Sequence, residues 1–271
     1  MKDCYEKKSF TEHFNRTNPH LLLSDEASRL AKAQKIFAVI REYVNNPEAL
    51  KESRCLDLGC SEGRMTHFMA DRVRRSFGID TDRPALKTAL EREPKTGAGF
   101  VCGSGLDLPF KDRSVDIIIC NQIYEHVPDP YRMLDEIKRI LKTGGFCFFG
   151  AGNRLKIIEG HYFLPFLSWL PKPLADMYLR MAGKGQSYEE LHFTYFGIRK
   201  MVRKFRVHDY TIDVIKNPDR FAFDDASRGV RLASKLPRWF LRIFLPLSPN
   251  YLFILTHPDS GLPPERVTGT K

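Results

Sequence analysis

The fold of this chain is predicted from one segment, Cys55-Leu56-Asp57-Leu58-Gly59-Cys60-Ser61-Glu62-Gly63-Arg64-Met65-Thr66. The segment has the pattern of a short buried strand, a glycine-bearing turn and the first turn of a helix. Gly59 and Gly63 allow a sharp bend and leave room for a ligand against the peptide planes. Asp57 stands at the end of the strand, and the N–H groups of the helix start point to the same place.

A second acid follows at the spacing that a nucleotide-type ligand requires. Twenty-one residues after Gly59, a short strand at 76–79 ends in Asp80, and Thr81 comes next. An acid about 20 residues beyond a glycine turn typically binds the hydroxyls of a ribose. Asp82 is explained by a cap on the following helix, so Asp80 is the better candidate for the ribose.

Two ligands fit this turn, a dinucleotide and S-adenosylmethionine (SAM). The spacing is Gly59-x-x-x-Gly63, and Ser61 stands where the dinucleotide motif G-x-G-x-x-G has its middle glycine. A pyrophosphate disfavours a nearby carboxylate, whereas the ammonium group of SAM can be held by Asp57 directly or through water. The charges therefore favour SAM, and the alternative is an ordinary strand–turn–helix that binds nothing.

Composition limits the class of protein. A chain of 271 residues with 42% hydrophobic residues can form one large domain, or one domain with an insertion. The formal charge of +10 suits nucleic acid, an anionic membrane surface, an acidic substrate or simply a solvated surface. The six cysteines form no C-x-x-C pair, which predicts reduced thiols in a cytoplasmic protein and no metal site. Neither a signal peptide nor a membrane-spanning helix is expected.

Strand and helix patterns alternate through the first half of the chain. A helix is predicted to start at Ser24-Asp25-Glu26 and to have an apolar face, and another starts at Asp129-Pro130 and closes with Lys142-Thr143-Gly144-Gly145. The apolar face consists of Leu30, Ala33, Phe37, Ile40 and Val44. Further strands are predicted at 99–102, 114–120 and 146–151. This alternation predicts a parallel sheet covered by helices on both faces, with ligands at the carboxyl ends of the strands.

Six short motifs within residues 53–152 resemble, in their order and spacing, a class I SAM-dependent methyltransferase of the methyltransferase type 11-like group. They are D-L-G-C-S-E-G (57–63), G-I-D (78–80), L-P-F (108–110), D-I-I-I-C-N (116–121), E-H-V-P-D-P (125–130) and L-K-T-G-G (141–145). The resemblance implies an α/β fold, namely a Rossmann-like, seven-stranded, doubly wound sheet with helical and aromatic cap insertions. It also implies SAM as the cofactor.

The resemblance also implies roles for individual residues. The methionine side of SAM would lie against Asp57, Gly59, Ser61, Gly63 and the backbone of Asn121. The ribose would lie against Asp80 and Thr81. The adenine would lie against Ser104, Gly105 and Leu106. Relatives often have Asp at the position of Ser104, where a carboxylate accepts from the adenine amino group. A neutral hydroxyl is expected to bind adenine more weakly.

Methyl transfer needs few side chains, because the sulfonium methyl is already electrophilic and positioning can supply about 7–11 kcal/mol of the barrier reduction. His126 is the first candidate for a base that deprotonates an oxygen acceptor, and Glu125 is the second. The alternative is that both residues close the loop without proton transfer. Tyr124, His161 and His192 are the further candidates for contact with the acceptor.

The chain is predicted to divide into five segments. They are a helical lead-in (1–52), a SAM-binding core (53–152), a cap insertion (153–190), a C-terminal part of the fold (191–257) with a second insertion (216–250), and a disordered tail (258–271). The C-terminal part should contain a helix at 194–205 and strands at 206–215 and 251–256. Ser187-Tyr188-Glu189-Glu190 has capping-box spacing, so Glu190 is expected to cap a helix.

Both insertions are rich in aromatic residues, broken by proline and flanked by Lys or Arg. They can form an apolar lid, pack on each other as a cap, or anchor the protein at a membrane interface through Trp169 and Trp239. A small-molecule or lipid-like acceptor, methylated at oxygen, fits each arrangement. The expected location is cytoplasmic, with peripheral membrane contact as an option.

Two other function classes remain open. The positive charge suits a methyltransferase for RNA or another nucleic acid. Asn121-Gln122-Ile123-Tyr124, however, lacks the prolines of the N-P-P-Y signature, and the basic residues are scattered, so nucleic acid is not favoured. The other class is a protein that binds SAM or a dinucleotide without transferring a group.

Overall fold

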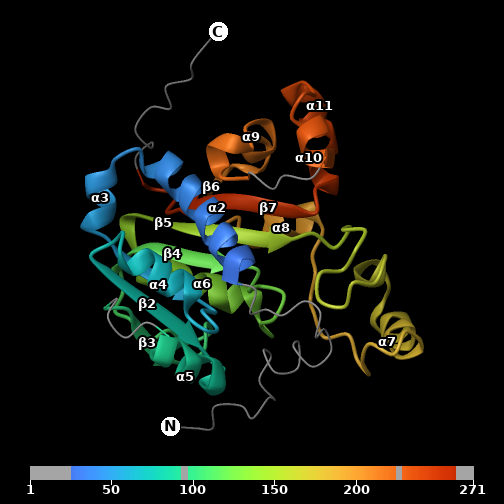
Figure 1. Cartoon of the computed structure of the whole chain (residues 1–271), viewed down its shortest axis with the longest axis horizontal. Helices are drawn as coiled ribbons and strands as arrows, with labels where there is room; N and C mark the ends of the chain where they lie inside the picture. Colours follow the sequence, from blue (N-terminus) through green and yellow to red (C-terminus); the bar gives the residue numbers. More distant parts are fainter. Residues whose placement is uncertain (1–25, 93–96, 224–227, 261–271) are drawn as a thin grey trace.

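A seven-stranded sheet forms the centre of the computed structural model, which describes residues 26–92, 97–223 and 228–260 (Figure 1). The strand order is β3-β2-β1-β4-β5-β7-β6. Strands β1 to β5 pair in parallel, and β7 runs antiparallel to both β5 and β6. The strands are β1 (Arg54–Leu58), β2 (Arg75–Asp80), β3 (Gly99–Cys102), β4 (Val115–Asn121), β5 (Leu141–Gly152), β6 (Arg206–Asp209) and β7 (Asn250–Thr256). This topology confirms the predicted Rossmann-like, doubly wound sheet.

Helices cover both faces of this sheet. Those of the core are α2 (Glu26–Val44), α3 (Pro47–Lys51), α4 (Arg64–Ala70), α5 (Arg83–Arg92), α6 (Pro130–Ile140), α8 (Tyr195–Met201) and α9 (Thr211–Lys216). The inserted segments add α7 (Lys172–Met181), α10 (Arg228–Ala233), α11 (Arg238–Phe244) and the 3-10 turns η1 (Leu167–Trp169), η2 (Asp219–Phe221) and η3 (Leu245–Leu247). Within the described part of the chain, no helix is both long enough and apolar enough to cross a bilayer.

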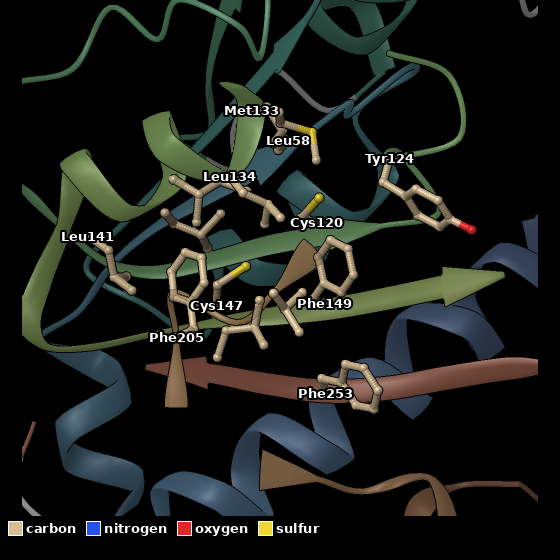
Figure 2. Close-up of a cluster of buried hydrophobic side chains, with 14 of the residues drawn as sticks. Leu58, Cys120, Tyr124, Met133, Leu134, Leu141, Cys147, Phe149, Phe205 and Phe253 are labelled. Carbon is tan, nitrogen blue, oxygen red and sulfur yellow. The ribbon is translucent and has the colours of Figure 1, made fainter. Parts of the chain in front are cut away.

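The strands are buried on both faces because their apolar residues alternate between two clusters. Leu58 of β1 and Cys120 of β4 pack with Met133 of α6 and with residues of α8, as Figure 2 shows for the α6 side. Cys55 and Ile117, from the same two strands, point the other way and pack with α2, α4 and α9. Continuous apolar runs such as 117–120 are therefore explained by burial on both faces, as expected for a parallel sheet.

The cysteines of the described residues are free thiols. Cys55, Cys60, Cys120 and Cys147 are buried and Cys102 is exposed, whereas Cys4 lies outside the described residues. Burial raises the pKa of the Cys55 and Cys120 thiols well above the usual value, which keeps them protonated and unreactive.

The predicted helix end at residues 142–145 is wrong. Helix α6 ends at Ile140, and strand β5 begins at the next residue. Lys142 reaches across to Asp116 of β4 with its Nζ 2.6 Å from Oδ1, and a Cβ on Gly145 would lie 2.6 Å from the Asp116 carbonyl oxygen. These contacts hold the segment against the neighbouring strand, where the pairing shifts register between Val115 and Ile117.

Predictions in the C-terminal part were correct for β7 and wrong in two places. The strand expected at 206–215 ends at Asp209, because the Asp209 carboxylate accepts the Thr211 N–H at 2.9 Å and turns the chain into α9. Glu190 caps no helix; α8 begins later, and Thr194 is its N-cap.

The two ends of the described chain also differ from expectation. Leu30 is 48% exposed, so the apolar face of α2 begins one turn later, at Ala33. Ser24 and Asp25, the predicted start of this helix, lie outside the described residues, as do residues 261–271 of the predicted disordered tail. At the start of that tail, the carbonyl oxygens of Pro258 and Ser260 accept hydrogen bonds from Arg206.

The two insertions do not pack on each other as a cap. The first has a small core of its own, in which Leu167 packs with Tyr162, Ala175, Leu179 and Tyr188. In the second, α10 and α11 lie against α9. Figure 1 shows α7 and α11 well apart, at the lower and upper right of the view. The segments contact each other near their bases, where Asn153 Nδ2 donates to the carbonyl oxygens of Pro246 and Ser248.

Gly63→Ala is expected to destabilise the fold by about 2–4 kcal/mol, because strain and overpacking add. The φ angle of Gly63 is +74°, and a Cβ would lie 2.6 Å from the Phe100 ring and 2.8 Å from the Ala89 Cβ. Gly183→Ala is the matched control: its φ is +65°, but nothing lies within 4 Å of an added Cβ, so only the backbone strain of about 1 kcal/mol applies. Chemical denaturation measures both, and equal losses would contradict the tight packing at Gly63.

Candidate functional site

The glycine turn between β1 and α4 is tied to the end of β2. The N–H groups of Gly59 and Cys60 donate to the Ile79 carbonyl oxygen at 2.9 and 3.1 Å. The Ser61 N–H donates to Asp80 Oδ2 at 2.7 Å, and the Asp82 N–H donates to Asp80 Oδ1 at 2.9 Å. The Asp80 carboxylate therefore lies directly beside the turn, as predicted from the spacing. Each of its oxygens keeps a lone pair that can accept from a ribose hydroxyl.

Asp57 lies beneath the same turn and is almost completely buried, at 5% exposure. Burial raises the pKa of its carboxyl group to about 7, although the Thr66 hydroxyl donates to Oδ2 at 2.8 Å and opposes this rise. Lys32 of α2 also favours the ionised form of Asp57. A bound ammonium group would do the same, so this carboxyl group is suited to the amino-acid end of SAM.

The turn has the shape that such a ligand needs. Gly59, Ser61 and Gly63 all have positive φ angles, of +72°, +48° and +74°. A Cβ on Gly59 would lie 2.2 Å from Ile123 Cδ1, so the backbone here approaches the loop after β4 closely. Peptide groups flanked by two buried or half-buried carboxylates suit a ligand with an ammonium group and a ribose, and the Asp57 carboxylate beneath them disfavours a pyrophosphate. The residues present therefore fit SAM.

The adenine side of the predicted site follows β3. The Ser104 hydroxyl accepts from the Leu106 N–H at 3.1 Å, which closes a local turn and leaves its own proton and a lone pair for another partner. Asn121 ends β4, and its side chain points at β5, since a Cβ on Gly150 would lie 2.1 Å from Asn121 Oδ1. This direction leaves the backbone of Asn121 for the methionine portion, as the resemblance implies.

Ser104→Asp is expected to bind SAM about three- to tenfold more tightly than wild type, and Ser104→Ala to bind more weakly. The reason is that a charged acceptor contributes about 1.5–3 kcal/mol to a hydrogen bond, against about 0.5–1.5 for a neutral one. Calorimetric titration measures both, and S-adenosylhomocysteine, which shares the adenine, is the control and should shift in parallel. Unchanged affinity in both variants would remove Ser104 from adenine binding.

Tyr124 holds the loop after β4 in place. Its side chain is completely buried, its hydroxyl donates to the Gly152 carbonyl oxygen at 2.5 Å, and it accepts from the Phe193 N–H at 3.2 Å. Figure 2 shows the ring at the edge of the buried cluster that also contains Cys120 and Phe149. The hydroxyl predicted to contact an acceptor is thus used to join three segments of the fold.

Glu125 and His126 lie next to this anchor. Glu125 is 1% exposed, and neither of its carboxylate oxygens has a hydrogen-bond partner. His126 is exposed, and its ring lies edge-on to that of His161 with centroids 4.9 Å apart. His192 is buried, with Nε2 3.6 Å from Glu159 Oε1. The structure therefore brings together four of the five residues predicted at the acceptor side.

Sequence reasoning missed Glu159, which organises this side of the site. It is completely buried and accepts the N–H groups of His161 and Tyr162 on Oε2 at 2.7 and 2.8 Å. Lys156 Nζ lies 3.2 Å from its other oxygen. The only signal in the sequence is an acid within an otherwise aromatic segment, which is too common to identify a site.

The electrostatics of this group keep the imidazoles neutral near pH 7. Burial lowers the pKa of the half-buried His161 imidazole to about 4. Burial raises the pKa of Glu125 and of Glu190 to about 7. Neutral imidazole nitrogens can accept a proton or bind a metal ion, whereas imidazolium can do neither.

Comparison with known proteins supports a methyltransferase core. The profile of a family described as "Methyltransferase domain" matches residues 56–149. An uncharacterized methyltransferase of Mycobacterium leprae is 38% identical over 107 residues, 39% of each chain. A probable SAM-dependent methyltransferase of Mycolicibacterium smegmatis is 31% identical over 105 residues, 39% of this chain and 40% of that one. A ubiquinone biosynthesis O-methyltransferase of Coxiella burnetii is 28% identical over 131 residues, 47% and 56% of the two chains.

The matched region thus spans only about two fifths to just over half the length of these relatives. Solved structures extend the likeness of fold to most of the chain. The PH0226 protein of Pyrococcus horikoshii aligns with a TM-score of 0.59 at 14% identity, covering 90% of this chain and 98% of that one. The YcgJ protein of Bacillus subtilis aligns with a TM-score of 0.50 at 15% identity, covering 83% and 99%. Residues 56–149 are thus similar to the methyltransferase domain family and to a probable SAM-dependent methyltransferase, which indicates SAM as the cofactor.

Proposed function

We propose that the protein transfers the methyl group of SAM to an oxygen atom of a small hydrophobic or lipid-like acceptor. One observation carries this proposal: His161 of the first insertion meets Glu125 and His126 at the loop after β4, the strand that pairs with β1 and its glycine turn. In a doubly wound sheet, the carboxyl ends of such neighbouring strands meet at the ligand-binding edge. An oxygen nucleophile requires a side chain that can remove its proton, placed beside the turn that binds the cofactor.

In this proposal, different residues bind the cofactor and remove the proton from the acceptor. Asp57 binds the ammonium group of SAM, and Asp80 binds the ribose hydroxyls, so the cofactor is fixed in one orientation. When bound, SAM supplies an electrophilic methyl group. The neutral imidazole of His126 accepts the proton of the acceptor hydroxyl as the oxygen–carbon bond forms and the sulfur–carbon bond breaks. Positioning supplies about 7–11 kcal/mol, and a base adds about 10²–10⁴-fold in rate.

His126→Gln is expected to lower turnover about 100-fold while the affinity for SAM stays within about twofold of wild type. Transfer of labelled methyl from SAM to a panel of phenols, catechols and long-chain alcohols measures turnover. His257→Gln is the control, because His257 contacts the Leu141 carbonyl oxygen at the opposite end of β5. Full turnover by His126→Gln would retire the role of this imidazole, and no transfer to any hydroxyl by wild type would contradict an oxygen acceptor.

The surface of the second insertion supports a hydrophobic acceptor delivered from a membrane. An exposed apolar stripe runs along α10, α11 and η3 at spacings of three and four residues, with Trp239 and Ile243 each 63% exposed. The stripe consists of Leu232, Leu236, Trp239, Ile243 and Leu247. Residues 228–250 contain no acid, and exposed Arg and Lys side chains flank the stripe. Apolar side chains beside basic ones suit the surface of an anionic bilayer.

Co-sedimentation with phosphatidylcholine vesicles, with and without phosphatidylserine, tests this contact. Binding is expected only with phosphatidylserine, and the double variant Trp239→Ser/Ile243→Ser should weaken it by at least about tenfold. Leu90→Ser is the matched control, since Leu90 is 59% exposed on the distant helix α5. Absence of binding to anionic vesicles would exclude the membrane contact and leave a soluble acceptor.

A further inference from the structure

A group of potential metal ligands stands at the acceptor side of the site. One ligand atom from each of Glu125, His126 and His161 lies within 4.8 Å of the others. Glu125 and His126 come from the loop after β4, whereas His161 comes from the first insertion. Two imidazoles and one carboxylate are the protein ligands of many catalytic Zn²⁺ sites, where water or substrate occupies the remaining position.

The Glu125 carboxylate lacks the partners that a buried acid needs. It is 1% exposed, and both of its oxygens are without a hydrogen bond. Burying a carboxylate without partners is unfavourable, so such groups are normally paired, protonated or bound to a metal ion. A dication between the carboxylate and the two imidazoles would supply the missing partner.

We propose that Glu125, His126 and His161 bind one divalent transition-metal ion, with Zn²⁺ the best match to the ligand set. Ligand atoms around a tetrahedral Zn²⁺ lie about 3.3 Å apart, given metal–ligand distances of about 2.0–2.1 Å. The three side chains therefore close by up to about 1.5 Å on binding. His126 is exposed and His161 is half-buried, and the two rings already contact each other edge-on.

The surroundings hold His161 in position for this role. Glu159 fixes the backbone of the turn by accepting the N–H groups of His161 and Tyr162, and Lys156 and His192 contact its other oxygen. Glu159 therefore supports His161 from behind the proposed site. No metal site was predicted from the sequence, because the three proposed ligands belong to separate segments of the chain.

The ion gives the site a way to activate an acceptor oxygen. A hydroxyl bound at the open coordination position has a lowered pKa and loses its proton to water, so the oxygen is a better nucleophile for the methyl group. His126 is then a metal ligand, and the proton transfer described above for its imidazole applies to the metal-free protein. This use of the ion rests on the proposed function, whereas metal binding itself does not.

Metal binding is tested without acceptor or SAM. The protein, stripped with EDTA and carrying Cys4→Ser and Cys102→Ser to remove adventitious thiols, is titrated calorimetrically with Zn²⁺ and spectroscopically with Co²⁺. One equivalent should bind, and the visible Co²⁺ bands should report a nitrogen and oxygen ligand set. Glu125→Gln and His161→Gln should each weaken binding by at least about tenfold, whereas His257→Gln should match the parent protein.

Two results would overturn the site: no binding of either ion, or binding that both ligand variants retain in full. Glu125→Gln guards against a folding artefact, because it replaces a buried unpaired carboxylate by a neutral group of the same shape. Circular dichroism checks the fold of each variant. SAM affinity, measured on the same samples, should stay unchanged, so a failure of cofactor binding is distinguished from a failure of metal binding.

Discussion

Asp80→Ala is expected to weaken SAM binding by about 100-fold or more. The Asp80 carboxylate accepts the N–H groups of Ser61 at 2.7 Å and Asp82 at 2.9 Å, so it fixes the glycine turn, and we propose that it also binds the ribose. Hydrogen bonds to a charged group contribute about 1.5–3 kcal/mol each, and losing two ribose contacts alone costs about 3 kcal/mol or more. Calorimetric titration with SAM and with S-adenosylhomocysteine measures the loss, which should be the same for both.

Asp82→Ala provides the matched control two residues away. Asp82 Oδ1 accepts the Ala85 N–H at 3.1 Å and caps α5, so the variant should lose about 1 kcal/mol of stability and keep its affinity for SAM. Wild-type affinity in Asp80→Ala would contradict its role at the ribose. Equal losses of affinity in the two variants would show that the loop as a whole, and not the Asp80 carboxylate, determines binding.

Asp57→Asn is expected to stabilise the ligand-free protein above pH 7. Burial raises the pKa of folded Asp57 to about 7, whereas an unfolded aspartate has a pKa of about 3.9. Between these values the folded state holds a proton that the unfolded state has lost, so this group makes stability fall as pH rises from about 4 to about 7, and the loss persists above that. At pH 8 the variant should be more stable by about 2–4 kcal/mol, and at pH 4 nearly equal to wild type.

The same substitution should weaken SAM binding at pH 8 by about tenfold or more, because the ammonium group loses its charged partner. Asparagine keeps an oxygen that can accept from Thr66, which donates to Asp57 at 2.8 Å. Chemical denaturation at the two pH values and calorimetry at pH 8 measure both effects. Asp116→Asn is the control, since that carboxylate pairs with Lys142 at the other end of β4. If the variant had wild-type stability and wild-type SAM affinity at pH 8, Asp57 would be neither a buried carboxyl group with a raised pKa nor a partner of the ammonium group.

Much of the fold could be predicted because the signals are local. The turn around Gly59 and Gly63, the acid at Asp80 and the last strand all stand in the sequence as short patterns with one reading. The errors came from tertiary contacts. Lys142 was assigned to a helix end, but in the structure it lies in strand β5 and forms an ion pair with Asp116 of the neighbouring strand β4. The strand expected to run to residue 215 ended at Asp209, whose carboxylate caps the next turn.

The two sides of the site were predictable to different degrees. The predicted cofactor side comes from contiguous motifs, so the positions of Asp57 and Asp80 beside the glycine turn could be predicted from the sequence alone. The acceptor side is assembled from the loop at Glu125 and from an insertion that matches no such motif. Glu159 is important there only because folding buries it beneath His161, and no spacing in the sequence indicates that contact. The roles of the individual site residues stay predictions until variants are measured.

Calorimetric titration of the wild-type protein with SAM, S-adenosylhomocysteine and NAD is the decisive test of the cofactor site. We expect micromolar binding of SAM and of S-adenosylhomocysteine with one site per chain, and no binding of NAD, because the Asp57 carboxylate repels a pyrophosphate. Binding of NAD without SAM, or no binding of SAM at all, would contradict a SAM site built on Asp57 and Asp80.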